Sequence, residues 1–192
     1  ILMLQKLNLN FLLQYLSYFI PISLVLGSLV VNTTVFLFLF LSIFYFIKNN
    51  IKINFDFQKI FLLLFFISVI FSSYLNIDII GKENFVKSVL LLKFFFIYIF
   101  LETLFAQKRI NLQVFLIICL ILTLFISLDS IFQFHSGKNI IGYPLHDGRV
   151  GSIFGSEAIA GAFIQKFFIF SLIGVYLITQ KKNLRINYFE IF

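Results

Sequence analysis

Residues Gln113 to Phe134 read QVFLIICLILTLFISLDSIFQF, an almost continuously apolar run whose single charge is Asp129. A helix needs roughly 20 apolar residues to cross the hydrocarbon core of a bilayer, and this run has that length. Inside lipid every backbone polar group must find a partner within the protein, which restricts a lone apolar run to a helix. The run is therefore predicted to be a membrane-spanning helix.

The composition of the whole chain agrees with that prediction. Hydrophobic residues make up 61% and charged residues 12% of the 192 residues, and 30 residues are Phe, which excludes a soluble domain. The alternating pattern of a barrel is absent. We therefore predict an all-α integral membrane protein. The formal net charge of +7 could suit nucleic acid, but the basic residues are scattered between apolar runs, so we exclude a nucleic-acid partner.

About six transmembrane helices are predicted in a single domain, 1–192, as one half of a larger polytopic bundle. The link from Asn76 to Lys87 is expected to lie along the interface as a short amphipathic turn. The break between the first two spans falls at Gly27 or equally at Asn32 to Thr34. The predicted spans are about 11–27, 28–47, 60–75, 88–105, 113–134 and 157–178, and the polar loop is 135–156.

The distribution of Lys and Arg predicts the orientation. Cytoplasmic loops carry an excess of basic residues, and six spans place both termini on one side. That side would hold nine basic residues and the other side four, so the N-terminus is predicted to be cytoplasmic and the polar loop extracytoplasmic. The nine are Lys6, Lys48, Lys52, Lys59, Lys108, Arg109, Lys181, Lys182 and Arg185, and the four are Lys82, Lys87, Lys138 and Arg149.

The polar segment after Phe134 is HSGKNIIGYPLHDGRVGSIFGSEAIAG, from His135 to Gly161. It contains six of the nine glycines, one of the two prolines and both histidines. Glycine permits backbone conformations that other residues avoid, and proline stiffens a turn. This segment is therefore predicted to be a shaped loop with a function beyond joining two helices.

Three charged side chains lie inside predicted spans. Lys93 and Asp129 are each five residues, roughly 7 to 8 Å, inside the outer ends of their spans, and are predicted to form an interhelical pair. Lys166 lies near the middle of the last span, where a lysine costs about 2.5 to 3.5 kcal/mol. It must face protein or a wet cavity: it forms a structural ion pair, snorkels towards the interface, or lies beside a substrate path. Glu102, close to Lys108, is expected to be solvated.

Arg149 is the candidate for binding phosphate. It lies among glycines just before the expected helix start at Ser156 and Glu157, and a guanidinium fork and free helix N–H groups both suit phosphate oxygens. A structural contact with Asp147 or Glu157 would give the same pattern. His135 and His146 could supply a base; the spacing of the polar residues suits no metal, no cofactor is predicted, and the single Cys119 is expected to be a packed thiol.

The run DSIFQFHSGKNIIGYPLHDGRVGSIFGSEAIAGAFI, from Asp129 to Ile164, resembles a segment of the O-antigen ligase and O-antigen polymerase family. In that segment a Gln-aromatic span end leads through a glycine-containing turn to an Arg-x-x-G-x-F-G-like motif and a Gly-containing helix. The sequences PISLVLGS, from Pro21, and VVNTT are also similar to the first hairpin of such proteins. One departure is Ser152, which stands where the motif usually has glycine.

The resemblance implies a multi-span glycosyltransferase of the bacterial inner membrane. Such an enzyme moves a glycan from an undecaprenyl-pyrophosphate carrier to an acceptor hydroxyl, on lipid A core for a ligase or on another glycan for a polymerase. Arg149 would stabilise the departing pyrophosphate, with Lys138 as a helper. Family members have about twice as many spans and a large later loop. The chain is therefore expected to be an N-terminal portion, inactive alone, with the base in the other half.

The alternative function is that of a transporter or channel subunit. Lys93, Asp129 and Lys166 would then line a path through the membrane. An inverted repeat of these six spans elsewhere in the gene would favour transport, whereas a large extracytoplasmic loop with Arg and His would favour transfer. The sequence does not choose between ligase and polymerase, and it does not name the sugar.

Overall fold

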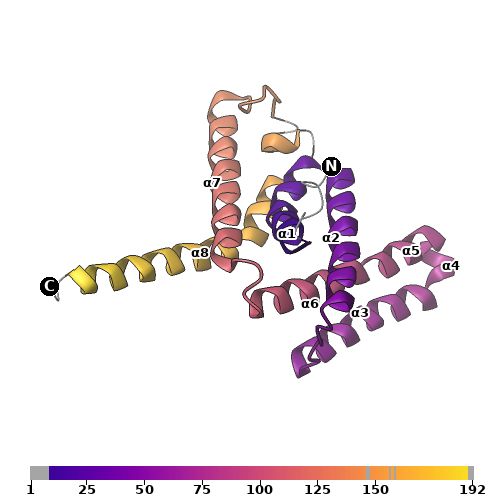
Figure 1. Ribbon diagram of the computed structural model, residues 1–192. Helices are drawn as coiled ribbons and strands as arrows, with labels where there is room; N and C mark the ends of the chain where they lie inside the picture. Colours follow the sequence, from indigo (N-terminus) through magenta and orange to yellow (C-terminus); the bar gives the residue numbers. More distant parts are fainter. Residues whose placement is uncertain (1–8, 146–147, 156, 158, 190–192) are drawn as a thin grey trace, which may run out of the picture. The chain divides into compact units, whose positions relative to one another are not determined.

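The computed structural model describes residues 9–145, 148–155, 157 and 159–189. This part of the chain is helical and contains no strand (Figure 1). An isolated antiparallel bridge joins Lys138 and Pro144. The helices are α1 (Leu9–Leu26), α2 (Ser28–Lys48), α3 (Phe57–Leu75), α4 (Ile77–Ile80), α5 (Lys82–Leu90), α6 (Leu92–Ala106), α7 (Leu112–Ser136), the short 3-10 helix η2 (Ser152–Phe154) and α8 (Ala160–Phe189).

Six helical segments of the described chain are long and apolar enough to cross a membrane. This confirms the all-α, multi-pass membrane class predicted from composition. The break between the first two spans falls at Gly27, whose φ of 109° favours glycine. The segments are Leu9–Leu26, Ser28–Lys48, Phe57–Leu75, Lys82–Ala106, Leu112–Ser136 and Ala160–Gln180.

Two predicted helix starts differ from the structure. The fourth segment begins at Lys82 rather than near Ser88, because Leu91 keeps a right-handed helical conformation and joins α5 to α6. The link predicted to be an amphipathic turn is thus α4 and the start of α5. The last helix begins at Ala160 rather than Glu157, because the chain first forms the turn of η2 and then reverses at Gly155, whose φ is 65°.

The chain divides into two compact units, Ile1–Ser17 with Asn32–Ile110 and Tyr18–Val31 with Asn111–Phe192. In the first unit, aromatic side chains join the helices. The Phe46 ring of α2 lies 4.9 Å from the Phe100 ring of α6, and Phe66 of α3 lies 6.2 Å from Phe95 of α6. Such edge-to-face pairs add about 0.5 to 1.5 kcal/mol to the area that they bury.

An ion cluster around the buried Lys59 also joins α3 to α6. Lys59 is only 3% exposed, and its Nζ lies 2.8 Å from Glu102 Oε2 and 3.2 Å from Asp56 Oδ2. Asp56 in addition caps α3, because its Oδ1 accepts from the Lys59 backbone N–H at 3.0 Å. Glu102 is therefore paired with Lys59 in the fold, and the expectation that it is merely solvated was wrong. A lysine inside the unit needs such partners to offset its lost hydration.

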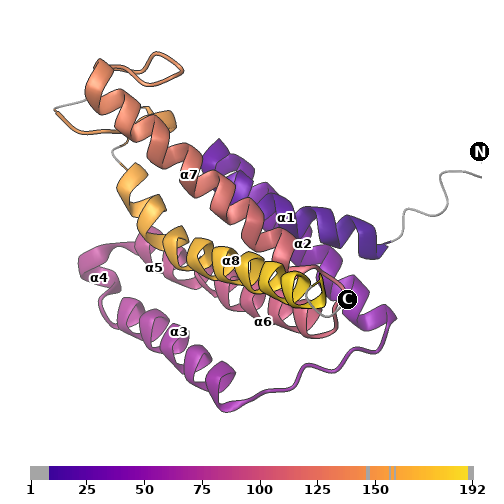
Figure 2. The ribbon, with the colours of Figure 1, turned by 90° about the vertical axis from the view of Figure 1, so that its left-hand side faces the viewer.

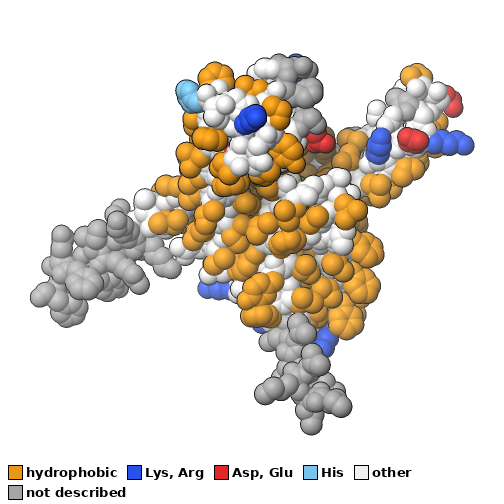
Figure 3. Space-filling view, turned by 90° about the horizontal axis from the view of Figure 1, so that it is seen from above, with side chains coloured by type: hydrophobic (Ala, Val, Ile, Leu, Met, Phe, Trp, Pro, Cys, Tyr) orange, Lys and Arg blue, Asp and Glu red, His pale blue; other side chains and the backbone are white. Residues whose placement is uncertain are grey.

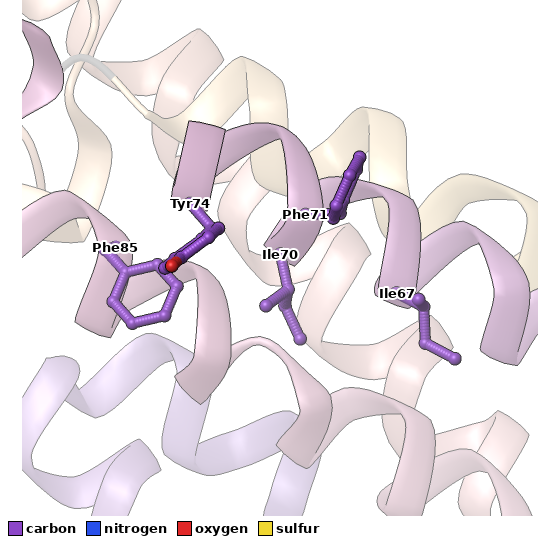
Figure 4. A pocket seen from close by; sticks show the side chains of 5 residues that line it. All are labelled: Ile67, Ile70, Phe71, Tyr74 and Phe85. Atoms are coloured by element: carbon purple, nitrogen blue, oxygen red, sulfur yellow. The ribbon is translucent and has the colours of Figure 1, made fainter. Parts of the chain in front are cut away.

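A hollow of about 270 Å³ lies between α3 and α5. Its lining is almost entirely apolar, and Figure 4 shows the rings of Tyr74 and Phe85 at one end of it. The other lining residues are Ile67, Ile70 and Phe71. Because no charged side chain lines it, the hollow offers packing volume rather than chemistry.

The second unit is centred on the packing of α7 against α8, which lie side by side in Figure 2. Ile126 of α7 packs with Ala160 and Phe163 of α8, and the rings of Phe163 and Phe167 stack at 4.5 Å. Gly174 allows close approach, because a Cβ there would lie 3.2 Å from the Leu116 carbonyl oxygen. This pair of helices supports the polar segment that connects them.

Many large hydrophobic side chains of the described helices are exposed, and they cover much of the face in Figure 3. Phe36, Leu29 and Phe61 are examples, with exposures of 69%, 77% and 67%. Such a surface would aggregate in water but is the surface that lipid chains require. The lipid bilayer is therefore its plausible environment.

Candidate functional site

The polar segment starts with a tight turn at the end of α7. Gly137 caps the helix with a φ of 77°, a left-handed conformation in which its N–H donates to the Gln133 carbonyl. The chain then reverses, and the Asn139 N–H donates to the Tyr143 carbonyl at 2.9 Å. The reversal closes where Leu145 N–H donates to the Gly137 carbonyl at 3.1 Å. The prediction of a shaped loop therefore has a structural basis.

Asn139 holds this turn together from inside. Asn139 is only 3% exposed. Its Oδ1 accepts from the N–H groups of Gly142 and Tyr143 at 2.8 and 2.7 Å. Its Nδ2 donates to the Ser152 carbonyl at 2.7 Å. One side chain thus satisfies the turn backbone and links it to the second half of the segment.

Ser152 is bonded through its backbone N–H, its carbonyl and its hydroxyl, and it is fully buried. Its N–H donates to Gln133 Oε1 at 2.6 Å, and its hydroxyl donates to Asp129 Oδ2. Asp129 and Gln133 are one helical turn apart on α7, so they face the segment together. Gln133 also donates to the carbonyls of Tyr143 and Pro144, at 3.1 and 3.2 Å.

These bonds fold the segment back along α7 rather than leaving it beyond the helix end. Asp129 is seven residues before Ser136, roughly 10 Å back along the helix axis. The second oxygen of Asp129 accepts from the Ile140 N–H at 2.9 Å. Non-helical backbone at such a depth is tolerated where protein buries and satisfies it, and the side chains of α7 do this here.

Two backbone features restrict the sequence around Ser152. Ser152 has a φ of 52°, a conformation that costs a non-glycine residue about 1 to 2 kcal/mol. Gly151 cannot carry a side chain, because a Cβ there would lie 2.1 Å from the Gly155 carbonyl oxygen. The three hydrogen-bonded groups of Ser152 offset its strain and keep Arg149, three residues earlier, on a fixed support.

Arg149 is exposed and lines an open groove of about 400 Å³. We call this the α7–α8 groove; its lining is Ser130 of α7, Arg149 and Val150 of the loop, and Ala160, Gly161 and Ile164 of α8. No ion pair of Arg149 is found among the described residues, and the suggested partner Asp147 lies outside them. Glu157 is exposed and forms no ion pair with Arg149.

The other predicted site residues that the structure describes do not line this groove. Lys138 is exposed in the turn, and the exposed His135 packs its ring against Phe134 at 5.6 Å. His146 lies outside the described residues. Lys166 is exposed on α8. In the described residues no group of His, Cys, Asp and Glu could hold a metal ion.

Lys93 and Asp129 were predicted to form an interhelical pair, and each has hydrogen-bond partners within its own unit. Lys93 Nζ donates to Asn32 Oδ1 at 2.7 Å, inside the first unit, whereas both Asp129 oxygens accept from Ser152 and Ile140, inside the second. The partners of Asp129 come from the loop, through the Ile140 N–H and the Ser152 hydroxyl.

Sequence reasoning missed Gln133, Asn139 and the structural importance of Ser152. Gln133 follows Asp129 by four residues, a spacing that puts both on one helix face, and this signal could have found it. Asn139 followed three residues later by Gly142 is typical of a side-chain-stabilised turn. The link between these two features depends on tertiary contacts.

In comparisons with known proteins, no family model, curated protein or solved structure matches this chain.

Proposed function

We propose that the protein is a membrane glycosyltransferase of O-antigen ligase or polymerase type. In this proposal it acts in lipopolysaccharide or surface polysaccharide synthesis at the outer face of the bacterial inner membrane. Its donor is a glycan on an undecaprenyl-pyrophosphate carrier, and its acceptor is lipid A core or a growing glycan. The N-terminus is cytoplasmic, which puts the segment from His135 to Glu157 outside.

The observation that carries the proposal is the position of Arg149. Arg149 has no ion-pair partner among the described residues and lines a groove, while Ser152 and Asn139 fix the backbone beside it. A purely connecting loop would not need a cation held on a buried polar support. The φ of Ser152, 52°, adds support, because the resembling motif has glycine at this position.

In the proposed reaction the acceptor hydroxyl oxygen attacks the anomeric carbon of the donor sugar. The bond from that carbon to the pyrophosphate oxygen breaks, and the pyrophosphate leaves with the electron pair while a base takes the hydroxyl proton. Arg149 stabilises the charge that develops on the leaving oxygens. Lys138 is a weaker, more distant helper, and the base is not assigned to any described residue.

The test replaces Arg149 in the protein as cells make it. Arg149→Lys should lose most of the transfer activity, because lysine keeps the charge but lacks the planar fork, and Arg149→Ala should lose more. The removal of one such electrostatic contact costs about 10²- to 10³-fold in rate. Transfer of lipid-linked glycan is measured beside the amount of folded protein in the membrane.

The comparison variant is Lys138→Ala, which removes the proposed helper cation outside the groove and should reduce transfer less than Arg149→Ala does. If Arg149→Ala retains normal protein levels and normal transfer, the proposed role of Arg149 is refuted. If the protein level falls and Lys restores part of it, Arg149 is a structural residue instead.

A further inference from the structure

The end of α2 forms an open groove of about 440 Å³ within the first unit. We call it the α2 groove; its lining is Phe46 and Ile47 of α2, and Asn50, Ile51, Lys52 and Ile53 of the link to α3. Figure 2 shows this link as an extended trace between the two helices. Because α2 and α3 are both long and apolar enough to cross a membrane, the link and the groove lie at the surface of the bilayer.

A hydrogen-bonded turn shapes this groove. Asn50 has a φ of 50°, and its N–H donates to the Ile47 carbonyl at 3.3 Å. The Ile51 N–H donates to the Phe46 carbonyl at 3.0 Å. These two bonds make a Schellman motif, which ends a helix and brings the residue after the turn, here Ile51, towards its last turn, here Phe46. Both donors are satisfied within the protein, so the turn itself needs no ligand.

Two lysines flank the turn, Lys48 at the end of α2 and Lys52 in the lining of the groove. Both are exposed, and neither forms an ion pair with a described residue. Asp56 is the next acidic residue along the chain, but it pairs with Lys59. The C-terminal end of a helix stabilises a cation such as Lys48, but Lys52 lies beyond the turn. Two lysines at the bilayer surface without an acidic partner favour an anionic ligand.

An apolar face of α2 leads through the membrane to the groove. Phe36, Phe40 and Ile47 are exposed by 69%, 62% and 72%, and their spacings of four and seven residues put them on one side of the helix. Ile47 belongs both to this face and to the lining of the groove. A ligand with an anionic head and hydrocarbon chains would contact the groove and this face together. A small anion would contact the groove and leave the face uncovered.

We propose that the α2 groove binds an anionic phospholipid of the bilayer, with its phosphate beside Lys52 and Lys48 and its acyl chains along Phe40 and Ile47. The predicted topology puts this groove on the cytoplasmic side, opposite the loop that carries Arg149. The ligand is a component of the membrane that is not consumed, and it holds the end of α2 at the bilayer surface. The inference goes beyond the proposed function and does not depend on glycan transfer.

The experiment counts bound lipids by native mass spectrometry of the protein as cells make it, in a non-ionic detergent. Dioleoyl phosphatidylglycerol is the probe, and dioleoyl phosphatidylcholine, which has the same chains and no net charge, is the reference. Wild-type protein should bind the first phosphatidylglycerol more tightly than phosphatidylcholine. Each lysine is expected to contribute about fivefold in affinity, so Lys52→Gln should weaken binding about fivefold and Lys48→Gln/Lys52→Gln about 25-fold.

The charge-matched control is Lys82→Gln/Lys87→Gln, which removes two exposed lysines of α5 in the same unit. It should bind phosphatidylglycerol as wild type does. A second pair of variants tests the groove while both of its lysines remain. Ile53→Trp fills the groove and should weaken binding, whereas Asn54→Trp, at an exposed residue outside the lining, should not. Circular dichroism of each variant verifies that the helices form.

The inference is overturned if Lys48→Gln/Lys52→Gln is folded and binds phosphatidylglycerol as wild type does, or if the α5 variant loses as much affinity. Equal wild-type affinity for the two lipids would overturn it as well. Glycerol phosphate, the free head group, should not displace the lipid at the same concentration; displacement would show a site for a small anion instead. None of these outcomes tests the proposed function, which is decided by Arg149 and glycan transfer.

Discussion

Ser152 shows how one residue can hold a conformation that its type disfavours. Its φ of 52° is strained for serine, but its N–H, carbonyl and hydroxyl are bonded to Gln133, Asn139 and Asp129. Because the residue is fully buried, the loss of any of these bonds would leave a polar group without water. The hydrogen bond of the Ser152 hydroxyl stabilises the fold, whereas the φ of Ser152 destabilises it. Substitutions at this position can measure the two contributions separately.

We predict that Ser152→Ala destabilises the protein more than Ser152→Gly does. Both variants lose the hydroxyl that donates to Asp129, at a cost of about 1 to 3 kcal/mol, but only alanine keeps the strain at this φ. Glycine should recover about 1 kcal/mol of it. Thermal unfolding in detergent, followed by circular dichroism, measures the difference. If alanine is as stable as glycine here, the conformation is not strained in the protein.

At the scale of elements, the loop after α7 packs on α7 and is held there by hydrogen bonds to its side chains. Asn111 caps its start, with Oδ1 accepting from the Gln113 N–H at 2.9 Å, and Gly137 caps its end. The two caps define the ends of α7, and Asp129 and Gln133 on one face of this helix bind the loop. In the other unit, α3 depends in a similar way on its cap Asp56 and on the ion cluster with Lys59.

Asp56 gives the protein a predicted acid sensitivity. The Lys59 backbone N–H that donates to it, more than the Lys59 ammonium, holds the pKa of Asp56 below its ordinary value of 3.8. A lowered folded-state pKa means that the stabilisation is present above about pH 4 and is lost as pH falls through the folded-state pKa. Asp56→Asn keeps a capping side chain but does not titrate.

The measurement is therefore the unfolding temperature between pH 3 and pH 7 for wild type and Asp56→Asn. Wild type should lose stability on acidification more than the variant does, so the difference between the two should shrink at low pH. Asp78→Asn, on α4, is the matched control for removing a carboxylate. Equal pH profiles of wild type and Asp56→Asn would show that the ionisation of the Asp56 carboxyl does not affect the stability of the protein.

At the scale of the whole molecule, six apolar helical segments and an asymmetric distribution of basic residues make a topology that can be tested. Charged side chains between spans set the orientation during insertion, whatever the later packing of the helices. The structure improves the choice of test positions: Ser152 is fully buried and unsuitable for labelling, whereas Ser136 and Ile141 are exposed.

We predict that Ser136→Cys and Ile141→Cys react with an impermeant thiol reagent in intact cells, because the loop is expected to be extracytoplasmic. Lys108→Cys, in the link between α6 and α7, should react only after the inner membrane is opened. The native Cys119 is buried and gives little background. The reverse pattern of labelling would overturn both the orientation and the proposed enzyme.

The sequence by itself determined the helical membrane class and the approximate position of each span. Apolar length is a local property, and lipid forces any such run to satisfy its own backbone, so no knowledge of the neighbours is needed. It also determined that the segment after α7 is a shaped polar loop with Arg149 in it, because glycine and proline act on the backbone locally.

Only the tertiary structure decided which polar groups meet. Asp129 was predicted to pair with Lys93, but it accepts from Ser152 and Ile140, and Glu102 was expected to be solvated, but it pairs with Lys59. A buried charge takes the donors that the folded backbone brings within about 3 Å. That distance depends on how α7 and the loop pack, and neither the spacing of residues nor their depth in a span specifies it.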